Sequence, residues 1–223
     1  MWSRHTRASL LALTLVAFAS GSAHAAVITW DNGGPDTSAF GSGNEIGEFL
    51  QADDFTFDRN MELTSVRFWS LRNPNSVFNG SLTWGILDDV GGAPNGLTTL
   101  ATGSASVTSV NTGLTQAGLQ VWVNDFTLPS VSLLAGHTYW LGLQNNGSFG
   151  SFSDFFWATT ALNALNSPTN RGQEWDLPFG GPWFTNNYEH AFQVTGNVPE
   201  PATLSLLGLG VALAARRLRR ARA

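Results

Sequence analysis

Between residues 26 and 197 the chain consists of short apolar runs separated by clusters of Gly, Pro, Asn, Asp and Ser. No stretch in this region keeps an apolar period of 3.6 residues, which argues against a helical core. In the clearest run, Tyr139, Leu141 and Leu143 alternate with other residues, as in a half-buried strand. Many short strands with frequent turns are typical of an all-β sandwich or barrel. We therefore expect an all-β fold, a single antiparallel β-sandwich, for residues 26–197.

Strands are expected where the alternation is clearest, and each has an inward face. In residues 49–57, Asp53, Phe55 and Phe57 share one face, and Asp54 lies on the other. The remaining expected strands are 27–30, 63–71, 82–86, 119–128, 137–144, 155–158 and 190–195.

Three parts of this region are less regular. Residues 97–118 are rich in Thr, Ser, Gly and Ala and predict one weak strand, at 106–110. Phe126 and Leu128 break the parity of the preceding apolar residues, which predicts a β-bulge near Asn124 and Asp125. Residues 163–183 hold three prolines and are expected to form a long irregular excursion.

The first 25 residues have the build of a secretory signal peptide. Arg4 and Arg7 give a positive start, residues 10–19 form an apolar core, and Ala23-His24-Ala25 has small residues flanking a variable one. We predict that signal peptidase cuts between Ala25 and Ala26. The alternative is an uncleaved N-terminal anchor, for which an apolar core of about ten residues is short.

The last 26 residues, 198–223, have three parts in a fixed order. The motif Val198-Pro199-Glu200-Pro201 comes first, a segment of 14 uncharged and mostly apolar residues (202–215) follows, and a basic tail ends the chain. A spanning helix needs roughly 20 apolar residues, so this segment is short for a permanent anchor. We expect a C-terminal hydrophobic helix that enters the membrane transiently.

The basic tail gives this segment an orientation. Arginines beside an apolar segment stay on the cytoplasmic side of a membrane. We therefore expect the tail to stop transfer and to leave the sandwich outside. Its arginines are Arg216, Arg217, Arg219, Arg220 and Arg222. A plain C-terminal anchor is the alternative.

The three-part tail resembles the PEP-CTERM sorting signal of exported bacterial proteins. The resemblance implies that an exosortase recognises the motif, cuts near it, and releases or re-attaches the protein. In that interpretation the motif residues are a substrate. The segments 51–55, 63–68, 134–141 and 191–194 are in turn similar to strands of PEP-CTERM ectodomains, which implies a jelly-roll-like sandwich. The expected division is signal peptide 1–25, ectodomain 26–197 and sorting signal 198–223.

Charge and cysteine content exclude several classes of function. Residues 26–197 hold four arginines, no lysine and 15 acidic residues, a formal charge of −11. Such a domain does not suit nucleic acid, which proteins bind mainly through basic contacts to phosphate. It suits divalent cations or neutral glycans. The chain has no cysteine, which excludes disulfides, cysteine nucleophiles and thiolate metal sites.

No cofactor is required by the sequence, and structural calcium is the metal that its acidic residues would suit. Calcium takes six to eight oxygen ligands, and several aspartates lie in or beside expected loops. Asp53 or Asp54 is the expected ligand. The alternative is that these aspartates only form turns or carry charge at strand ends.

Two tryptophans are candidates for stacking on a sugar ring. Trp175 and Trp183 lie in the proline-rich excursion beside amides and acids, and aromatic rings supply large contact areas. The alternative is that each tryptophan holds its own segment against the domain.

No catalytic residue is expected. The region 26–197 holds only two histidines, His137 and His190, and no serine within Gly-x-Ser-x-Gly. We predict a non-enzymatic, exported protein of the cell surface or extracellular matrix. Its expected role is structural or adhesive in exopolysaccharide or biofilm, with an exopolysaccharide or other glycan as partner. The alternatives are a carbohydrate-binding module and a glycan-active hydrolase.

Overall fold

β-Strands form nearly all the regular structure among the residues that the computed structural model describes, which are 25–38, 42–73, 76, 78–145, 154–160, 171–176, 182–186, 188–199, 210, 217, 219 and 220. The strands are β1 Val27–Asp31, β2 Gly43–Glu45, β3 Phe49–Thr56, β4 Met61–Arg72, β5 Ser81–Asp89, β6 Pro94–Ser106, β7 Thr108–Gln116, β8 Leu119–Leu133, β9 Thr138–Asn145, β10 Phe155–Thr160, β11 Gln173–Asp176, β12 Trp183–Thr185, β13 Glu189–His190 and β14 Phe192–Asn197.

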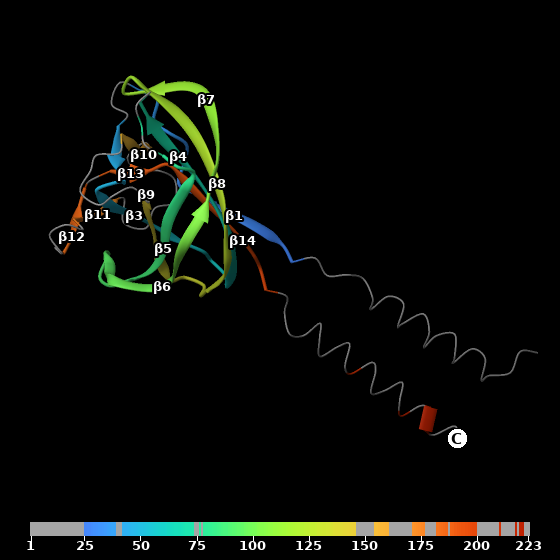
Figure 1. Ribbon diagram of the computed structural model, residues 1–223. Helices are drawn as coiled ribbons and strands as arrows, with labels where there is room; N and C mark the ends of the chain where they lie inside the picture. Colours follow the sequence, from blue (N-terminus) through green and yellow to red (C-terminus); the bar gives the residue numbers. More distant parts are fainter. Residues whose placement is uncertain are drawn as a thin grey trace, which may run out of the picture. The chain divides into compact units, whose positions relative to one another are not determined.

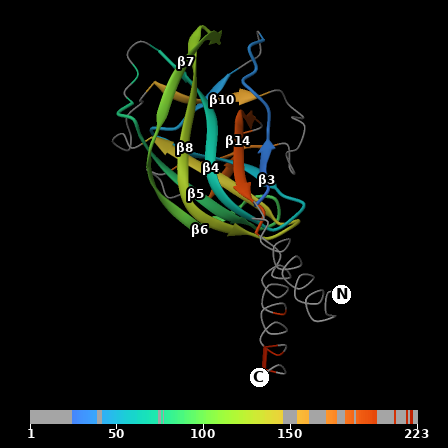
Figure 2. The same cartoon turned by 90° about the vertical axis from the view of Figure 1, so that its right-hand side faces the viewer.

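The strands form two antiparallel sheets that lie face to face (Figures 1 and 2). Sheet A has the order β1-β14-β4-β8-β7, and β10 with β2 and β13 continues it beside the end of β4. Sheet B has the order β12-β11-β3-β9-β5-β6. The chain crosses repeatedly between the sheets, for example from β3 to β4 and from β4 to β5. The predicted all-β sandwich is confirmed.

Strand β4 is the strand around which sheet A is arranged. One of its edges pairs with β8 over nearly its whole length. Its other edge pairs first with β14, for example Phe68 with Phe192, and then with β10, where Ser70 lies opposite Trp157. The 12 residues of β4 therefore hold three strands in one layer.

The main core fills the space between the sheets. Alternate residues of facing strands point inward, as the sequence predicted for 82–86, 139–143 and 190–195. Aromatic rings make up much of this layer, with edge contacts such as Phe68 with Phe126 and with Trp157. The largest fully buried side chains of this core are Trp157, Phe55, Phe68, Phe155, Phe192, Ile46, Met61, Leu63, Leu82 and Ile86.

A second, smaller apolar cluster covers the outer face of sheet A at one end. It consists of the buried residues Leu71, Val121, Ala158 and Ala191. The predicted bulge near Asn124 and Asp125 is wrong, and the parity of the apolar residues changes there because Val121 is buried on the outer face of β8 and Phe126 on the inner face. Pairing of β4 with β8 keeps one register from residues 65 to 72, and the shift lies between Leu63 and Ser65.

Two regions that the sequence left irregular contain strands. Residues 97–118 form most of β6 and β7, far more than the one weak strand predicted at 106–110. Within 163–183, β11 pairs with β3, and Trp183 begins β12. The rest of that excursion is described at Arg171, Gly172 and Pro182 only. Among the described residues, no helix is both long and apolar enough to cross a membrane.

The chain divides into two units, Val27–Val198 and the combined ends Met1–Ala26 with Pro199–Ala223. Several predicted terminal features lie outside the described residues, namely Ala23, Glu200, Pro201 and Arg216. Of the hydrophobic segment 202–215, only Gly210 is described. Of the predicted terminal features, the structure describes Ala25, Ala26, Val198, Pro199, Arg217, Arg219 and Arg220.

Replacing Gly196 by alanine is expected to destabilise the sandwich by about 1–3 kcal/mol, the usual range for overpacking. Gly196 lies at a register shift between β14 and β4, and a Cβ atom there would come within 2.6 Å of the backbone oxygen of Glu62. Gly34→Ala is the matched control, because a Cβ there meets nothing within 4 Å. Chemical denaturation monitored by tryptophan fluorescence measures both variants. Equal stabilities would contradict the prediction.

Candidate functional site

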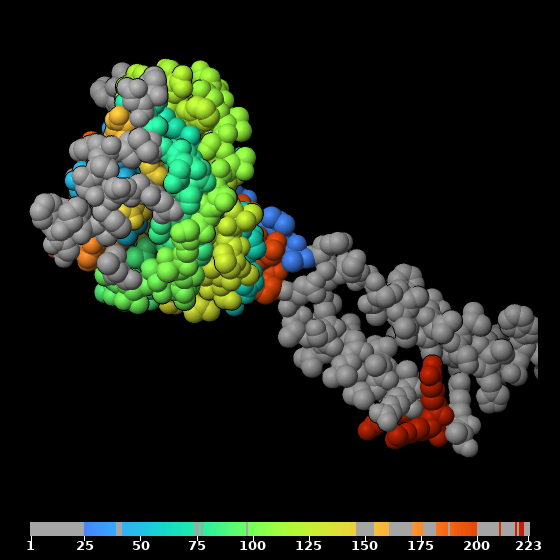
Figure 3. Space-filling view, in the orientation of Figure 1, coloured from blue at the N-terminus to red at the C-terminus, as the bar shows by residue number. Residues whose placement is uncertain are grey.

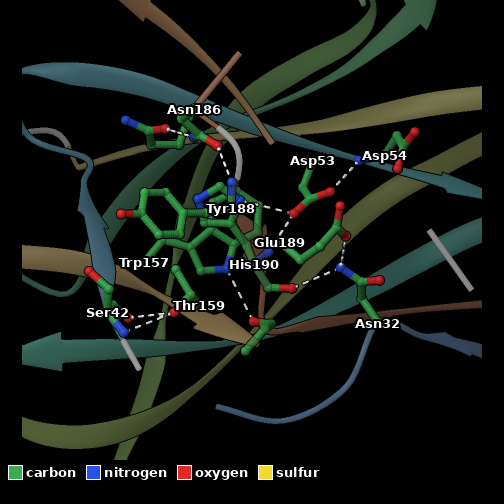
Figure 4. A network of polar contacts seen from close by, with 12 residues as sticks. Asn32, Ser42, Asp53, Asp54, Trp157, Thr159, Asn186, Tyr188, Glu189 and His190 are labelled. Atoms are coloured by element: carbon green, nitrogen blue, oxygen red, sulfur yellow. Dashed lines mark hydrogen bonds and ion pairs between the residues drawn. The ribbon is translucent and has the colours of Figure 1, made fainter. Parts of the chain in front are cut away.

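A buried polar cluster lies between the sheets, around Asp53 and His190 (Figure 4). Asp53 points inward from β3 in sheet B, and His190 comes from β13 in sheet A; neither has exposed surface. The Asp53 carboxylate Oδ2 accepts a hydrogen bond from the His190 backbone N–H at 2.5 Å. The same oxygen lies 2.9 Å from His190 Nδ1. The pair thus connects the two sheets directly.

The His190 ring is fixed by its neighbours. It lies against the Trp157 ring, tilted by 30° with ring centroids 4.4 Å apart, and the Trp157 indole N–H donates to the Ala191 carbonyl at 3.1 Å. The backbone of Gly172 passes so close that a Cβ atom there would lie 2.6 Å from His190 Cε1. Within the described residues, His190 Nε2 has no hydrogen-bond partner.

Acids and amides surround this pair. Asn32 donates from Nδ2 to Glu189 Oε2 at 3.1 Å and to the His190 carbonyl at 2.9 Å. Gln51 donates to Glu174 Oε2 at 2.6 Å. The carboxylates of Glu189 and Glu174 therefore accept hydrogen bonds from uncharged side-chain amides.

Burial sets the protonation of the central pair. It raises the pKa of the Asp53 carboxyl well above its ordinary value, and the nearby Asp54 charge raises it further. Burial also lowers the pKa of His190 to about 4, although Glu189 and Glu174 oppose that shift. Both groups therefore favour their neutral forms, and His190 is uncharged at pH 7.

The pair has the atoms of an acid–base dyad, but the site is closed. Neither side chain has exposed surface. The arrangement is suited to joining the two sheets. Sequence reasoning treated His190 only as one of two histidines, because its partner Asp53 is 137 residues away in the chain.

The two aspartates predicted as calcium ligands do not converge. Asp53 points into the sandwich, and Asp54, next in the strand, lies on the other face of sheet B. Asp53 Oδ1 accepts the Asp54 backbone N–H at 2.8 Å, and Oδ2 is used by His190. Among the described residues, no group of three or more His, Cys, Asp or Glu side chains could hold a metal. Calcium binding at either residue stays a prediction.

The two candidate tryptophans form a cross-strand pair at the edge of sheet B. Trp175 on β11 lies opposite Trp183 on β12, with ring centroids 5.4 Å apart. The Trp183 indole N–H donates to the Gly96 carbonyl at 2.6 Å, and its ring packs against buried Leu87 and Trp140. A tryptophan that holds its own segment would make these contacts. Stacking on a sugar by either ring stays a prediction.

A polar hollow of about 530 Å³ opens on the outer face of sheet A. Its lining side chains come from β1, β14, β4 and β8 and from both sides of the β6–β7 junction. Arg67 and Asp125 form a bidentate ion pair across it, with nitrogen–oxygen distances of 2.8 and 3.0 Å. The hydroxyls of Thr29 and Thr195 lie 2.8 Å apart. This hollow was not predicted from the sequence. The polar residues that alternate with apolar ones along 63–71 and 190–195 could have indicated a polar outer face there.

The ends of the sandwich lie side by side. Val27, the first residue of β1, pairs with Asn197, the last residue of β14. Val198 packs against the main core, and Pro199 is exposed. The predicted sorting motif therefore begins directly after the last strand.

Comparisons with known proteins agree with the interpretation of this tail. The model of the family described as PEP-CTERM protein-sorting motif matches residues 197–220. A comparison with curated proteins gave no match. Among solved structures, a CocE/NonD family hydrolase from Staphylococcus aureus is similar at 10% identity and a TM-score of 0.28. The match covers 78% of this chain and 34% of that chain, so this chain spans about a third of the hydrolase's length.

Lowering the pH from 6.5 to 4 is expected to reduce the free energy of unfolding by up to about 3 kcal/mol through His190 alone. The unfolded chain binds a proton on this residue near pH 6.5, whereas the folded protein does so only near pH 4. His190→Asn keeps a donor near the Nδ1 position and cannot be protonated, so its stability should fall less steeply.

Urea denaturation at several pH values measures this difference in slope. The raised pKa of Asp53 acts with the opposite sign and is common to both proteins. The control is His137→Asn, at an exposed histidine, which should keep the wild-type slope. If His190→Asn and wild type had equal slopes, the assignment of this pH dependence to His190 would be wrong.

Proposed function

We propose that this chain, which carries the PEP-CTERM sorting motif, is an exosortase-processed β-sandwich protein of the cell surface or extracellular matrix. We further propose a structural or adhesive role in exopolysaccharide or biofilm. The motif implies export and recognition by an exosortase. The observation that carries the proposal is the position of this motif, which starts where the last strand of the sandwich ends.

Both predicted cuts would leave the sandwich whole. Strand β1 begins at Val27, just after the predicted signal peptidase site at Ala25 and Ala26. Strand β14 ends at Asn197, just before the motif. Strands β1 and β14 pair with each other. A cut within β1 would remove the edge strand of sheet A, and a cut within β14 would remove an inner strand. The strand limits are thus compatible with processing at both ends.

A structural role is supported by what the described residues offer. The Asp53–His190 pair is buried between the sheets, and the polar hollow described above lies on the outer face of sheet A. A folded domain without disulfides, with a charge of −11, suits a soluble extracellular unit.

Intact mass measured by cell fraction tests the proposal. We expect a chain that begins at Ala26, ends near Pro199 to Pro201, and lies outside the cytoplasm. The double variant Pro199→Ala/Pro201→Ala should keep the residues after the motif, because the exosortase would no longer find the Pro-Glu-Pro segment that it recognises. Pro182→Ala, at an exposed proline of the sandwich, is the control. Wild-type protein that retains Arg216–Ala223 in the inner membrane would mean that the tail is only an anchor.

Carbohydrate binding is the second candidate function, and the polar hollow of sheet A is the observation that favours it. The hollow is lined by hydroxyl groups, by one amide and by an ion pair whose two charges cancel. Such a lining suits a neutral, hydroxyl-rich ligand. The acidic domain around it disfavours anionic polymers.

Affinity electrophoresis in gels with galactomannan or laminarin tests this second candidate. We expect Thr127→Val/Thr195→Val to weaken retention by about tenfold, since each lost hydrogen bond contributes about 0.5–1.5 kcal/mol. Thr115→Val, at an exposed threonine outside the hollow, is the control. Loss of binding only in Trp175→Ala or Trp183→Ala would instead place the site at the tryptophan pair. No retention of wild type would remove this candidate.

A further inference from the structure

The outward side chains of sheet A form two polar rows that run across the strands. In the first row, Thr195 on β14 lies between Thr29 on β1 and Ser65 on β4. Ser65 in turn lies opposite Thr127 on β8. Every member of this row carries a hydroxyl group. We call these four residues the hydroxyl row.

The second row lies two residues further along each strand. Gln193 lies between Asp31 and Arg67. Asp125 lies between Arg67 and Thr108, which is the first residue of β7. Side chains are in contact along this row, since Gln193 Nε2 donates to Asp31 Oδ2 at 2.9 Å and Arg67 forms its ion pair with Asp125. We call these five residues the ion-pair row.

Both rows face solvent, and all their members except Asp31 line the polar hollow. Each side chain of the two rows is exposed or half-buried. Figure 3 shows the blue atoms of β1 and the orange-red atoms of β14 together at the surface, beside yellow-green atoms of β8. Neighbouring strands lie about 4.8 Å apart, so the hydroxyl row is roughly 14 Å long. The hollow is therefore an elongated polar strip, longer than a single sugar ring.

The ion pair in this strip offers a donor and an acceptor side by side. Arg67 Nε and Nη2 donate to the two Asp125 oxygens at 2.8 and 3.0 Å, and Nη1 makes no hydrogen bond within the described residues. The two side chains are 47% and 46% exposed. A sugar hydroxyl both donates and accepts, and hydrogen bonds to charged groups are the stronger kind. Two neighbouring hydroxyls of one sugar unit can therefore bind together, one accepting from Arg67 and the other donating to Asp125.

We propose that the hollow binds the middle of an extended, neutral polysaccharide chain, which lies across the strands of sheet A. Two neighbouring hydroxyls of one sugar unit bind the Arg67–Asp125 pair, and the next units along the chain reach Thr195 and Thr29. The inference rests on the second candidate function, carbohydrate binding, and adds the length of the ligand, its direction and the residues that select it.

The charges of the strip support a neutral ligand. The two rows hold two carboxylates, of Asp31 and Asp125, and one guanidinium, of Arg67. An acidic polysaccharide would be repelled both by this balance and by the domain charge of −11.

Competition between short and long sugars tests the extended ligand. The full-length chain, purified in a mild detergent, is run in gels that contain laminarin or galactomannan, with added competitor. We expect a hexasaccharide of the same sugar to release the protein at about a tenfold lower concentration than the monosaccharide. Only the longer ligand can form hydrogen bonds with both the ion pair and the far end of the hydroxyl row.

Matched variants test the ion pair. Arg67→Lys keeps the positive charge but loses the planar fork that holds the carboxylate, so we expect retention to weaken by about tenfold. Arg59→Lys is the control, because Arg59 forms the same kind of bidentate pair with Asp58, and neither residue lines the hollow. Thermal unfolding confirms that each variant is folded.

The possible outcomes separate this inference from carbohydrate binding itself. Retention of the wild type with equal competition by monosaccharide and hexasaccharide would leave carbohydrate binding in place and overturn the extended ligand. Equal retention of Arg67→Lys and Arg59→Lys would overturn the role of the ion pair. No retention of the wild type in either gel would remove carbohydrate binding, and this inference with it.

Discussion

Apolar packing between the inner faces of the two sheets is the interaction on which the other features depend, because the chain has no cysteine to add a covalent link. That packing needs two sheets with regular, mutually facing rows of side chains. Strand β4 supplies much of this regularity, since β8, β14 and β10 all take their register from it. Aromatic residues on these strands then fill the layer with edge contacts between rings.

Within the described residues, His190 Nε2 and Asn32 Oδ1 have no partner, but several other polar groups in this layer are held by partners. Arg72 is an example, because its guanidinium carbon lies 4.5 to 4.7 Å from the rings of Phe78, Trp122 and Phe155. It also donates to Ser70, Ser109 and Asn124, and burial lowers its pKa to about 10. The Arg72 charge is therefore accommodated by hydrogen bonds and ring contacts, as the Asp53–His190 pair is accommodated by its own hydrogen bonds.

The sequence predicted those parts of the fold where alternation coincides with burial. Asp53 was placed on the same face as Phe55 from parity alone, and both are fully buried. The pattern failed where burial does not follow one face. Val121 and Phe126 lie on opposite faces of β8, yet both are buried, so a straight strand looked like a bulged one. In β6 the residues packed on the core are small, such as Ala101 and Ala105, and most exposed residues of β6 and β7 are Thr, Ser and Asn, so these edge strands had little apolar signal.

The candidate sites were less predictable than the strands, for a related reason. Asp53 and His190 are brought together by the pairing of β13 with β10 and the packing of two sheets, neither of which leaves a local trace in the sequence. The hollow of sheet A likewise draws single residues from several strands. The sorting motif was predictable because all three of its parts are contiguous in the chain.

The position of the chain ends connects the fold with the proposed sorting. In sheet A the order β1-β14-β4-β8-β7 places β1 and β7 at opposite edges. The residues that lead to both predicted processing sites leave from β1 and β14, which pair with each other. Cuts before Val27 and after Asn197 would therefore leave the pairing of β4 with β8, and of β8 with β7, unchanged.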